Sequence, residues 1–266
     1  EVAEYAEYKG VGRIFIDLEW NGKQERQGHL DTLISRHKME DVAKVRAHIS
    51  KAELLVRLNP LYAGTKQEID DAISGGANLL MLPMFHHPKE LEEFSCLVNG
   101  RAGIIPLVET YAAAESMAEI VKIAGITEIF IGLNDLHLDM KLDFMFEPLA
   151  NGYVDSLVDI IKNGGLPFGF GGIARMGEGI VPGEMILGEH LRLGSSSVIL
   201  SRTFHRKSER LADFKENINL GEELAKLVSV GDKLKQRNKE QEIADYQHLK
   251  SVINKFVKWK TNEANL

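Results

Sequence analysis

The fold can be inferred from one stretch, Gly103-Ile104-Ile105-Pro106-Leu107-Val108-Glu109-Thr110. It is a short apolar run that is followed directly by a carboxylate, Glu109. A second stretch, Glu128-Ile129-Phe130-Ile131-Gly132-Leu133-Asn134-Asp135, repeats the pattern. Short continuous apolar runs are typical of strands buried in a parallel sheet. Proteins of the α/β class place ligands and metals at the carboxyl ends of such strands. We therefore expect Glu109 and Asp135 at the rim of a parallel sheet.

Five further runs of this kind bring the number of expected strands to seven, and most are separated by amphipathic helical stretches. Alternating strands and helices predict a parallel sheet with right-handed crossovers. Because the chain opens with a helix-like segment, the economical interpretation is an α/β fold, a (β/α)8 TIM barrel whose first strand is missing from the chain start. An open doubly wound sheet is the alternative, but no GxGxxG loop or P-loop follows the first expected strand. The expected strands are Arg13–Leu18, Leu54–Leu58, Leu79–Met84, Gly103–Val108, Glu128–Leu133, Pro167–Gly171 and Ser197–Leu200.

The pattern of apolar residues changes after His205. Residues 1–205 are predicted to form the barrel domain, and residues 206–266 are predicted to form a C-terminal helical extension without strands. Apolar side chains recur there at helical or near-heptad spacing. Such stripes need burial, so the extension should pack on the barrel or on a partner subunit of a homo-oligomer.

Composition excludes several classes of protein. The 266-residue chain has a net charge of −7, and no basic stripe interrupts its first two hundred residues, so nucleic acid is a poor partner. No apolar run approaches the roughly 20 residues that span a bilayer, and no signal peptide is visible, so we expect no membrane association. The single cysteine, Cys96, is compatible with a reducing, cytoplasmic location.

Polar and charged side chains follow the expected strands. The strand ends carry, in order, Asp17 and Glu19, Arg57 and Asn59, Pro83 and Met84, Glu109, Asn134 with Asp135, and the glycine-rich run Gly169–Gly172. Buried charges are expensive unless they are paired or bound to metal. Glu109 and Asp135 could therefore share a hard cation such as Mg2+ or Mn2+. The plainer interpretations are a salt bridge from Arg57 to Glu19 or Glu109, unrelated solvated acids, and a tight glycine turn.

A resemblance to a known family rests on five short motifs in a fixed order. These are Ile16-Asp17-Leu18-Glu19, Val56-Arg57-Leu58-Asn59-Pro60, Met81-Leu82-Pro83-Met84, Val108-Glu109-Thr110 and Gly132-Leu133-Asn134-Asp135-Leu136. Over residues 1–205 the chain resembles the HpcH/HpaI aldolase and citrate lyase beta-subunit family of the phosphoenolpyruvate/pyruvate barrel superfamily. The resemblance implies a (β/α)8 barrel, usually oligomeric, with C-terminal helices exchanged or packed between subunits.

The resemblance also implies roles for individual residues. Glu109 and Asp135 would be the metal ligands, and Arg57 would lie beside the enolate oxygen. Glu19 would lie near the metal or its waters, and the backbone around Asn134 and Asp135 would receive the substrate carboxylate. The expected chemistry is formation or cleavage of a carbon–carbon bond to a 2-oxo acid such as pyruvate, because a metal and an arginine can stabilise the enolate.

The chain departs from this family at the general base. The resemblance places a His–Asp dyad at positions that here are Trp20 and Ser74. His29 and His137 are the candidate replacements that we assign to catalysis, and His86 and His87 also follow a strand end. Trp20 and Pro83 are expected to line the substrate pocket.

Three functions stay open at this point. The first is a metal-dependent aldolase acting on a 2-oxo acid. The second is a citrate-lyase-like enzyme acting on an acyl thioester. The Asp17-Leu18-Glu19 motif favours this function, but the sequence shows no basic cluster that would suit the phosphates of CoA. The third is a catalytically impaired barrel that binds a metal and a carboxylate, which the missing dyad motivates.

Overall fold

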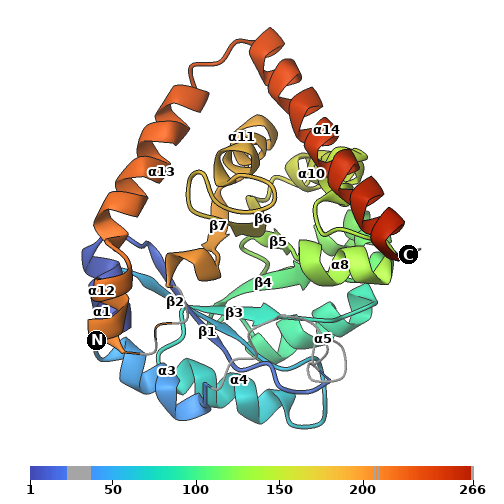
Figure 1. The fold of residues 1–266 in the computed structure, drawn as a ribbon. Coiled ribbons are helices and arrows are strands. Elements are labelled where there is room, and N and C mark those ends of the chain that lie inside the picture. Colours follow the sequence, from blue (N-terminus) through green and yellow to red (C-terminus); the bar gives the residue numbers. More distant parts are fainter. Residues whose placement is uncertain (23–36, 206–207, 209, 265–266) are drawn as a thin grey trace. The chain divides into compact units, whose positions relative to one another are not determined.

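The structure is a computed structural model of the whole chain, and it describes residues 1–22, 37–205, 208 and 210–264. The chain divides into two compact units, Glu1–Ile129 and Phe130–Leu266. Figure 1 labels the helices and strands of both units.

The first unit is built on four parallel strands that are neighbours in chain order. They are β1 (Arg13–Asp17), β2 (Glu53–Arg57), β3 (Leu79–Leu82) and β4 (Gly103–Val108). The register places Asp17 directly opposite Arg57. Parallel neighbours end on the same edge, so this register alone brings the two charged side chains to one rim.

Helices connect these strands and cover one side of the sheet, where α3, α4 and α5 lie in Figure 1. Each helix turns an apolar stripe inward: Val42, Ile69 and Leu91 have no exposed surface. Helix α5 begins at Pro88, and the carboxylate of Glu90 accepts the backbone N–H groups of the two preceding histidines. The helices of this unit are α1 (Val2–Tyr8), α3 (Met39–Arg46), α4 (Thr65–Ser74), α5 (Pro88–Val98), α6 (Tyr111–Glu115) and α7 (Met117–Ile120).

The second unit continues the same strand–helix repeat. Strand β5 (Ile129–Ile131) spans the boundary between the units, and β6 (Phe168–Ile173) pairs in parallel with β7 (Ser197–Leu200). The other elements are α8 (Leu133–Asp139), α9 (Glu147–Ala150), α10 (Tyr153–Asn163), α11 (Gly183–Leu193), the 3-10 helix η1 (Arg202–Phe204), α12 (Leu211–Asn217), α13 (Leu220–Leu234) and α14 (Lys239–Ala264). Parallel strands in chain order with intervening helices are the repeat of a (β/α)8 barrel, and C-terminal helices follow it. The predicted fold class is confirmed.

The glycine-rich run Gly169–Gly172 lies inside β6 and not at its end, where we had expected it. A Cβ on Gly169 would come within 2.6 Å of the ring of Phe130 and 2.7 Å of the backbone carbonyl of Ser197. The pairing with β7 shifts register between Gly169 and Gly172. The absence of a side chain at Gly169 allows β7 and an aromatic ring to approach closely, which is a packing role.

The C-terminal helices pack on elements of their own unit. The hydroxyl of Tyr246 in α14 donates to the carbonyl of Leu149 at 3.1 Å, and the guanidinium of Arg192 lies over the Tyr246 ring. Near the end of α14, the rings of Phe256 and Phe144 lie 4.4 Å apart. The predicted helical character of this segment is confirmed, while the predicted domain boundary after residue 205 stays a prediction. None of the helices in the described part of the chain combines the length and the apolar character that a membrane crossing needs.

A buried histidine ties α11 to β6. The ring of His190 stacks on Phe170 with centroids 3.8 Å apart, and its Nδ1 lies 2.9 Å from the hydroxyl of Ser195. The Nε2 atom is buried and has no hydrogen-bond partner among the described residues. Burial lowers the pKa of His190 to about 3, so the ring is neutral at physiological pH.

We expect this histidine to make the protein less stable in mild acid. The unfolded chain takes up a proton near pH 6.5, whereas the folded protein does so only near pH 3, so stability falls as the pH drops through that window. Between pH 7.5 and pH 5 the loss from this residue is about 2 kcal/mol. Urea unfolding at the two pH values measures it.

The matched variants are His190→Gln and His248→Gln, since His248 is exposed on α14. His190→Gln should be less stable at pH 7.5 but should lose most of this pH dependence, and His248→Gln should behave like the wild type. An unchanged pH dependence in His190→Gln would contradict the assignment.

Candidate functional site

The predicted site residues divide between the two units. Glu19, Trp20, Arg57, Pro83 and Glu109 belong to the first unit, at or just beyond the carboxyl ends of β1 to β4. Asn134, Asp135 and His137 belong to the second unit, in the first two turns of α8. His29 lies outside the described residues.

Arg57 is held by two carboxylates of the neighbouring strand. Its Nε donates to Oδ1 of Asp17 at 2.9 Å and its Nη2 donates to Oδ2 at 2.8 Å, while Oε2 of Glu19 lies 3.4 Å from Nη2. Burial opposes the charge of Arg57, but the hydrogen bonds and attraction to Asp17 outweigh burial and raise the pKa of the guanidinium above its ordinary value. The predicted contact between Arg57 and Glu19 is therefore present, and the stronger partner is Asp17.

Glu109 follows β4 and is oriented by a main-chain donor. Its side chain is buried, and its Oε1 accepts the backbone N–H of Met84 at 3.1 Å. Met84 has a φ of +53°, a left-handed conformation that is uncommon outside glycine. Backbone strain of this kind clusters at functional sites. Glu109 and Arg57 both lie at strand ends of the first unit, and the charge of Glu109 adds to the rise in the pKa of Arg57.

The turn after β1 is held by an amide. Oδ1 of Asn59 accepts the backbone N–H groups of Trp20 and Asn21 at 2.8 and 2.9 Å. The other end of Asn59 donates to Glu68 of α4, a buried carboxyl whose pKa is raised by that burial. The backbone of Trp20 is thus fixed while its indole is 60% exposed, and Pro83 is buried beside Met84.

Asp135 and His137 lie near the N-terminus of α8, directly after β5. The ring Nδ1 of His137 is 3.2 Å from the carbonyl of Leu133, in the preceding turn of the same helix. Burial lowers the pKa of His137, and the charge of Lys260 on α14 adds to this effect, so the imidazole is neutral at pH 7. A neutral imidazole can accept a proton, but this one is also engaged by its own helix.

Sequence reasoning missed three residues that the structure makes important. Asp17 was noted only as a strand end, because its register opposite Arg57 is seen only in the structure. Glu68 could not be found, because only the tertiary contact with Asn59 reveals it. Arg175 follows β6 with 8% exposure and pairs with Glu178, and its position as the first charge after a strand was the available signal.

The residues at the two dyad positions cannot act as an acid–base pair. The indole of Trp20 is exposed and carries no titratable group, and Ser74 is the exposed last residue of α4. Within the described ranges, no group of three or more histidine, cysteine, aspartate or glutamate side chains could hold a metal. A site with two carboxylates and water remains compatible with this finding, and the buried, main-chain-oriented carboxylate of Glu109 is a suitable donor for a hard cation.

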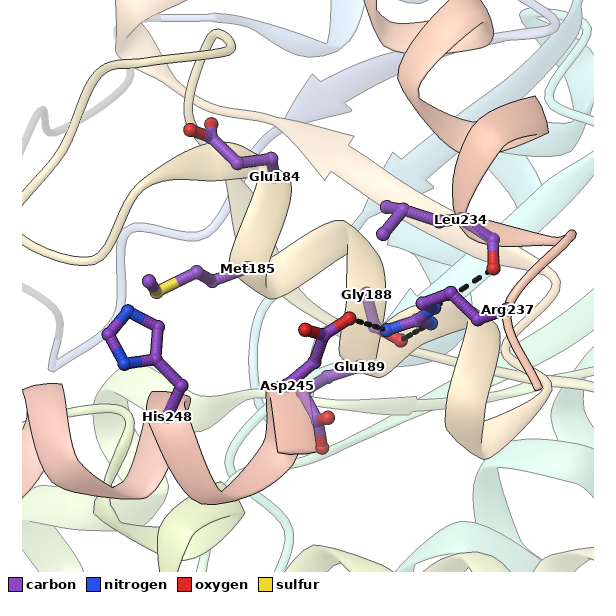
Figure 2. A pocket seen from close by; sticks show the side chains of 8 residues that line it. All are labelled: Glu184, Met185, Gly188, Glu189, Leu234, Arg237, Asp245 and His248. Atoms are coloured by element: carbon purple, nitrogen blue, oxygen red, sulfur yellow. Dashed lines mark hydrogen bonds and ion pairs between the residues drawn. The ribbon is translucent and has the colours of Figure 1, made fainter. Parts of the chain in front are cut away.

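A pocket of about 160 Å³ lies elsewhere in the second unit, between α11 and the junction of α13 and α14 (Figure 2). Arg237 reaches into it and donates to the carbonyls of Leu234 and Gly188 and to Asp245. All three of its nitrogens are engaged by the protein, so Arg237 joins the helical junction to α11. None of the predicted site residues that the structure describes lines this pocket.

Comparisons with known proteins agree with the motifs. The family described as HpcH/HpaI aldolase/citrate lyase has a sequence model that matches residues 31–145. The resemblance to the HpcH/HpaI aldolase/citrate lyase family is confirmed. The matched stretch includes the segments that carry Arg57, Glu109 and Asp135. No curated protein sequence matches the chain.

Solved structures of this family share the fold. An HpcH/HpaI aldolase/citrate lyase family protein from Burkholderia cenocepacia is 17% identical, with a TM-score of 0.59 over 75% of this chain and 82% of that one. The HpcH/HpaI aldolase from Desulfitobacterium hafniense is 14% identical, with a TM-score of 0.56 over 75% and 80%. The protein CitE from Mycobacterium tuberculosis, crystallised with magnesium and acetate, is 14% identical, with a TM-score of 0.53 over 92% of both chains. At these identities the likeness concerns the fold.

We predict that Asn59 is what keeps the Trp20 turn rigid. Asn59→Ala removes the acceptor for two backbone N–H groups, which should cost about 1–3 kcal/mol of stability and increase the mobility of the turn. The chain has two tryptophans, so a Trp259→Phe background leaves Trp20 as the only tryptophan, which can be excited apart from the six tyrosines. Its fluorescence anisotropy should fall in Asn59→Ala. Asn217→Ala, on the exposed helix α12, is the control, and an unchanged anisotropy would refute the role of Asn59.

Proposed function

We propose that this protein is an enzyme, a lyase that forms or cleaves a carbon–carbon bond to a 2-oxo acid such as pyruvate through an enolate. The observation that carries the proposal is the buried guanidinium of Arg57, held at the carboxyl ends of parallel strands beside Glu19 and Glu109. A fixed positive charge of this kind stabilises negative charge that develops on a reacting oxygen. The confirmed resemblance to a family named for aldolases and citrate lyases supports the same chemistry.

In this proposal Glu109 and Asp135 would hold Mg2+ or Mn2+. When bound, the cation would act as a Lewis acid towards the keto and carboxylate oxygens of the substrate. The carboxylate of Glu109 is already oriented by the N–H of Met84, so little reorganisation would be needed on binding.

The other residues would bind and orient the substrate. Arg57 would contact the enolate oxygen, and the backbone at Asn134 and Asp135 would receive the substrate carboxylate. The exposed indole of Trp20, on its rigid turn, would line the pocket beside Pro83. His137 is the candidate base among the described residues, because its buried imidazole is neutral, and Glu19 would lie near the cation or its waters.

A second candidate is a lyase acting on an acyl thioester, with the same enolate chemistry. The specific observation in its favour is the absence of titratable side chains at positions 20 and 74, where the aldolase base would stand. The Asp17-Leu18-Glu19 motif also favours the citrate-lyase-like enzymes. The third possibility is a barrel that binds a metal and a carboxylate without turnover.

We also propose that the protein forms a homo-oligomer. Large apolar side chains are exposed on the C-terminal helices, at Val228, Ile243 and Trp259. Apolar surface of this kind is commonly covered by a partner. The number of subunits is left to measurement by light scattering.

The decisive experiment is proton exchange. The protein is incubated with pyruvate and Mg2+ or Mn2+ in D2O, and the methyl proton signal is followed by NMR. We expect exchange that stops when the metal is removed by EDTA, and a loss of at least about 100-fold in Glu109→Gln, because that variant removes a charged ligand. Glu115→Gln, at the end of α6 and away from the strand ends, is the matched control.

The outcomes separate the three functions. Metal-dependent exchange that Glu109→Gln abolishes supports the 2-oxo acid lyase, and an aldehyde screen would follow. No exchange with pyruvate, but exchange of the acetyl protons of acetyl-CoA, would move the assignment to the thioester lyase. Metal-dependent binding of pyruvate without any exchange would identify the binding barrel.

A further inference from the structure

The hydrogen bonds of Arg57 are unequally distributed over its three nitrogens. Nε and Nη2 both point at the carboxylate of Asp17, and Nη2 also faces Glu19. Nε uses its one hydrogen and Nη2 uses one of its two hydrogens in bonds to Asp17, and the Glu19 carboxylate lies 3.4 Å from Nη2 as an ion pair. Within the described residues Nη1 makes no hydrogen bond, and its two hydrogens remain for a ligand.

Asp17 is itself held in place. Its Oδ1, which accepts from Arg57, also accepts the backbone N–H of Glu19 at 3.1 Å. The ring of Phe15 lies on the same face of β1, with the guanidinium 5.6 Å from its centroid. The side chains of Arg57 and Asp17 are only 15% and 12% exposed. The guanidinium plane is therefore set by the strand pairing and by two contacts with β1.

We propose that Asp17 is a positioning residue which restricts Arg57 to contact a single substrate oxygen through Nη1. A guanidinium with two free nitrogens binds a carboxylate by a two-point fork. In Arg57 the Nε and Nη2 pair already binds Asp17, and the negative charge of Glu19 beside Nη2 disfavours a second carboxylate there, so Nη1 is the nitrogen left for the substrate. The geometry suits one oxygen that becomes charged during the reaction, such as an enolate oxygen, and the carboxylate of the substrate must be held by other groups.

This inference rests on the proposed function, and it makes a distinctive kinetic claim. A residue that binds the substrate carboxylate contributes equally before and during the reaction, so its loss raises KM. A residue that meets charge only in the transition state affects kcat. Asp17 should therefore influence kcat for pyruvate proton exchange and leave KM for pyruvate nearly unchanged.

The first test does not depend on activity. In protein labelled with 15N at arginine Nε, the Arg57 Nε–H should exchange slowly with solvent, and Arg57→Lys identifies the signal by removing it. Asp17→Asn exchanges one acceptor oxygen for an amide donor, so the slow exchange should be lost. Asp213→Asn is the matched control, because Arg210, just before α12, forms a similar two-point pair with Asp213 in that helix.

The second test measures the exchange reaction. Asp17→Asn should lower kcat by roughly 10- to 100-fold, somewhat less than the loss of a whole oxyanion donor, with KM for pyruvate within about threefold of the wild type. Asp213→Asn should leave both unchanged. The double variant Asp17→Asn/Arg57→Lys should be no slower than Arg57→Lys alone, because the two residues act as one unit.

Three results would overturn the proposal. These are slow Nε–H exchange that persists in Asp17→Asn, a rise in KM with kcat unchanged, and additive losses in the double variant. Thermal melting of each variant shows whether it is folded, and Asp17→Glu provides a second variant if Asp17→Asn is not. If the wild type itself shows no proton exchange, the proposed function has failed, and the NMR test still decides whether Asp17 holds Arg57.

Discussion

The first unit depends on one buried ion pair at the ends of two parallel strands. A guanidinium that is mostly removed from water must meet carboxylates, because an unpaired buried charge would cost several kcal/mol. The register of β1 and β2 supplies Asp17 directly opposite Arg57, and the chain direction then brings Glu19 to the same nitrogen. The position of the turn after β1 follows from this pair, since Asp17 also accepts the N–H of Glu19.

Hydrogen bonds from backbone N–H groups orient the other side chains at this rim. Asn59 holds the turn that carries Trp20, and the left-handed Met84 directs its N–H at Glu109. These contacts orient charged groups without adding further charge. In the proposed function, side chains that are oriented before a ligand binds would lower the reorganisation that catalysis requires.

The second unit buries two histidines in addition to its charged pairs. His190 stacks on Phe170 and is held neutral by burial, and His137 is neutral for the same reason. The C-terminal helix α14 contacts the segment that follows α8, where Lys260 donates to the carbonyl of Asp143 at 2.6 Å. The C-terminal helix thus packs close to the segment that follows the helix of Asp135.

The strand–helix repeat, the residues at the strand ends and the family resemblance could all be predicted from the sequence. Strands β4 and β7 have the bounds that their apolar runs predicted. For β4 the reason is that a run buried on both faces can be recognised without its neighbours. The hydrogen-bond and ion-pair partners of these side chains are seen only in the tertiary structure. Only the strand register shows that Asp17 takes Arg57, only packing shows that Gly169–Gly172 lies within β6, and only folding brings Glu68 to Asn59. Contacts between residues distant in the chain leave no local pattern, so spacing could place these side chains at a rim but could not pair them.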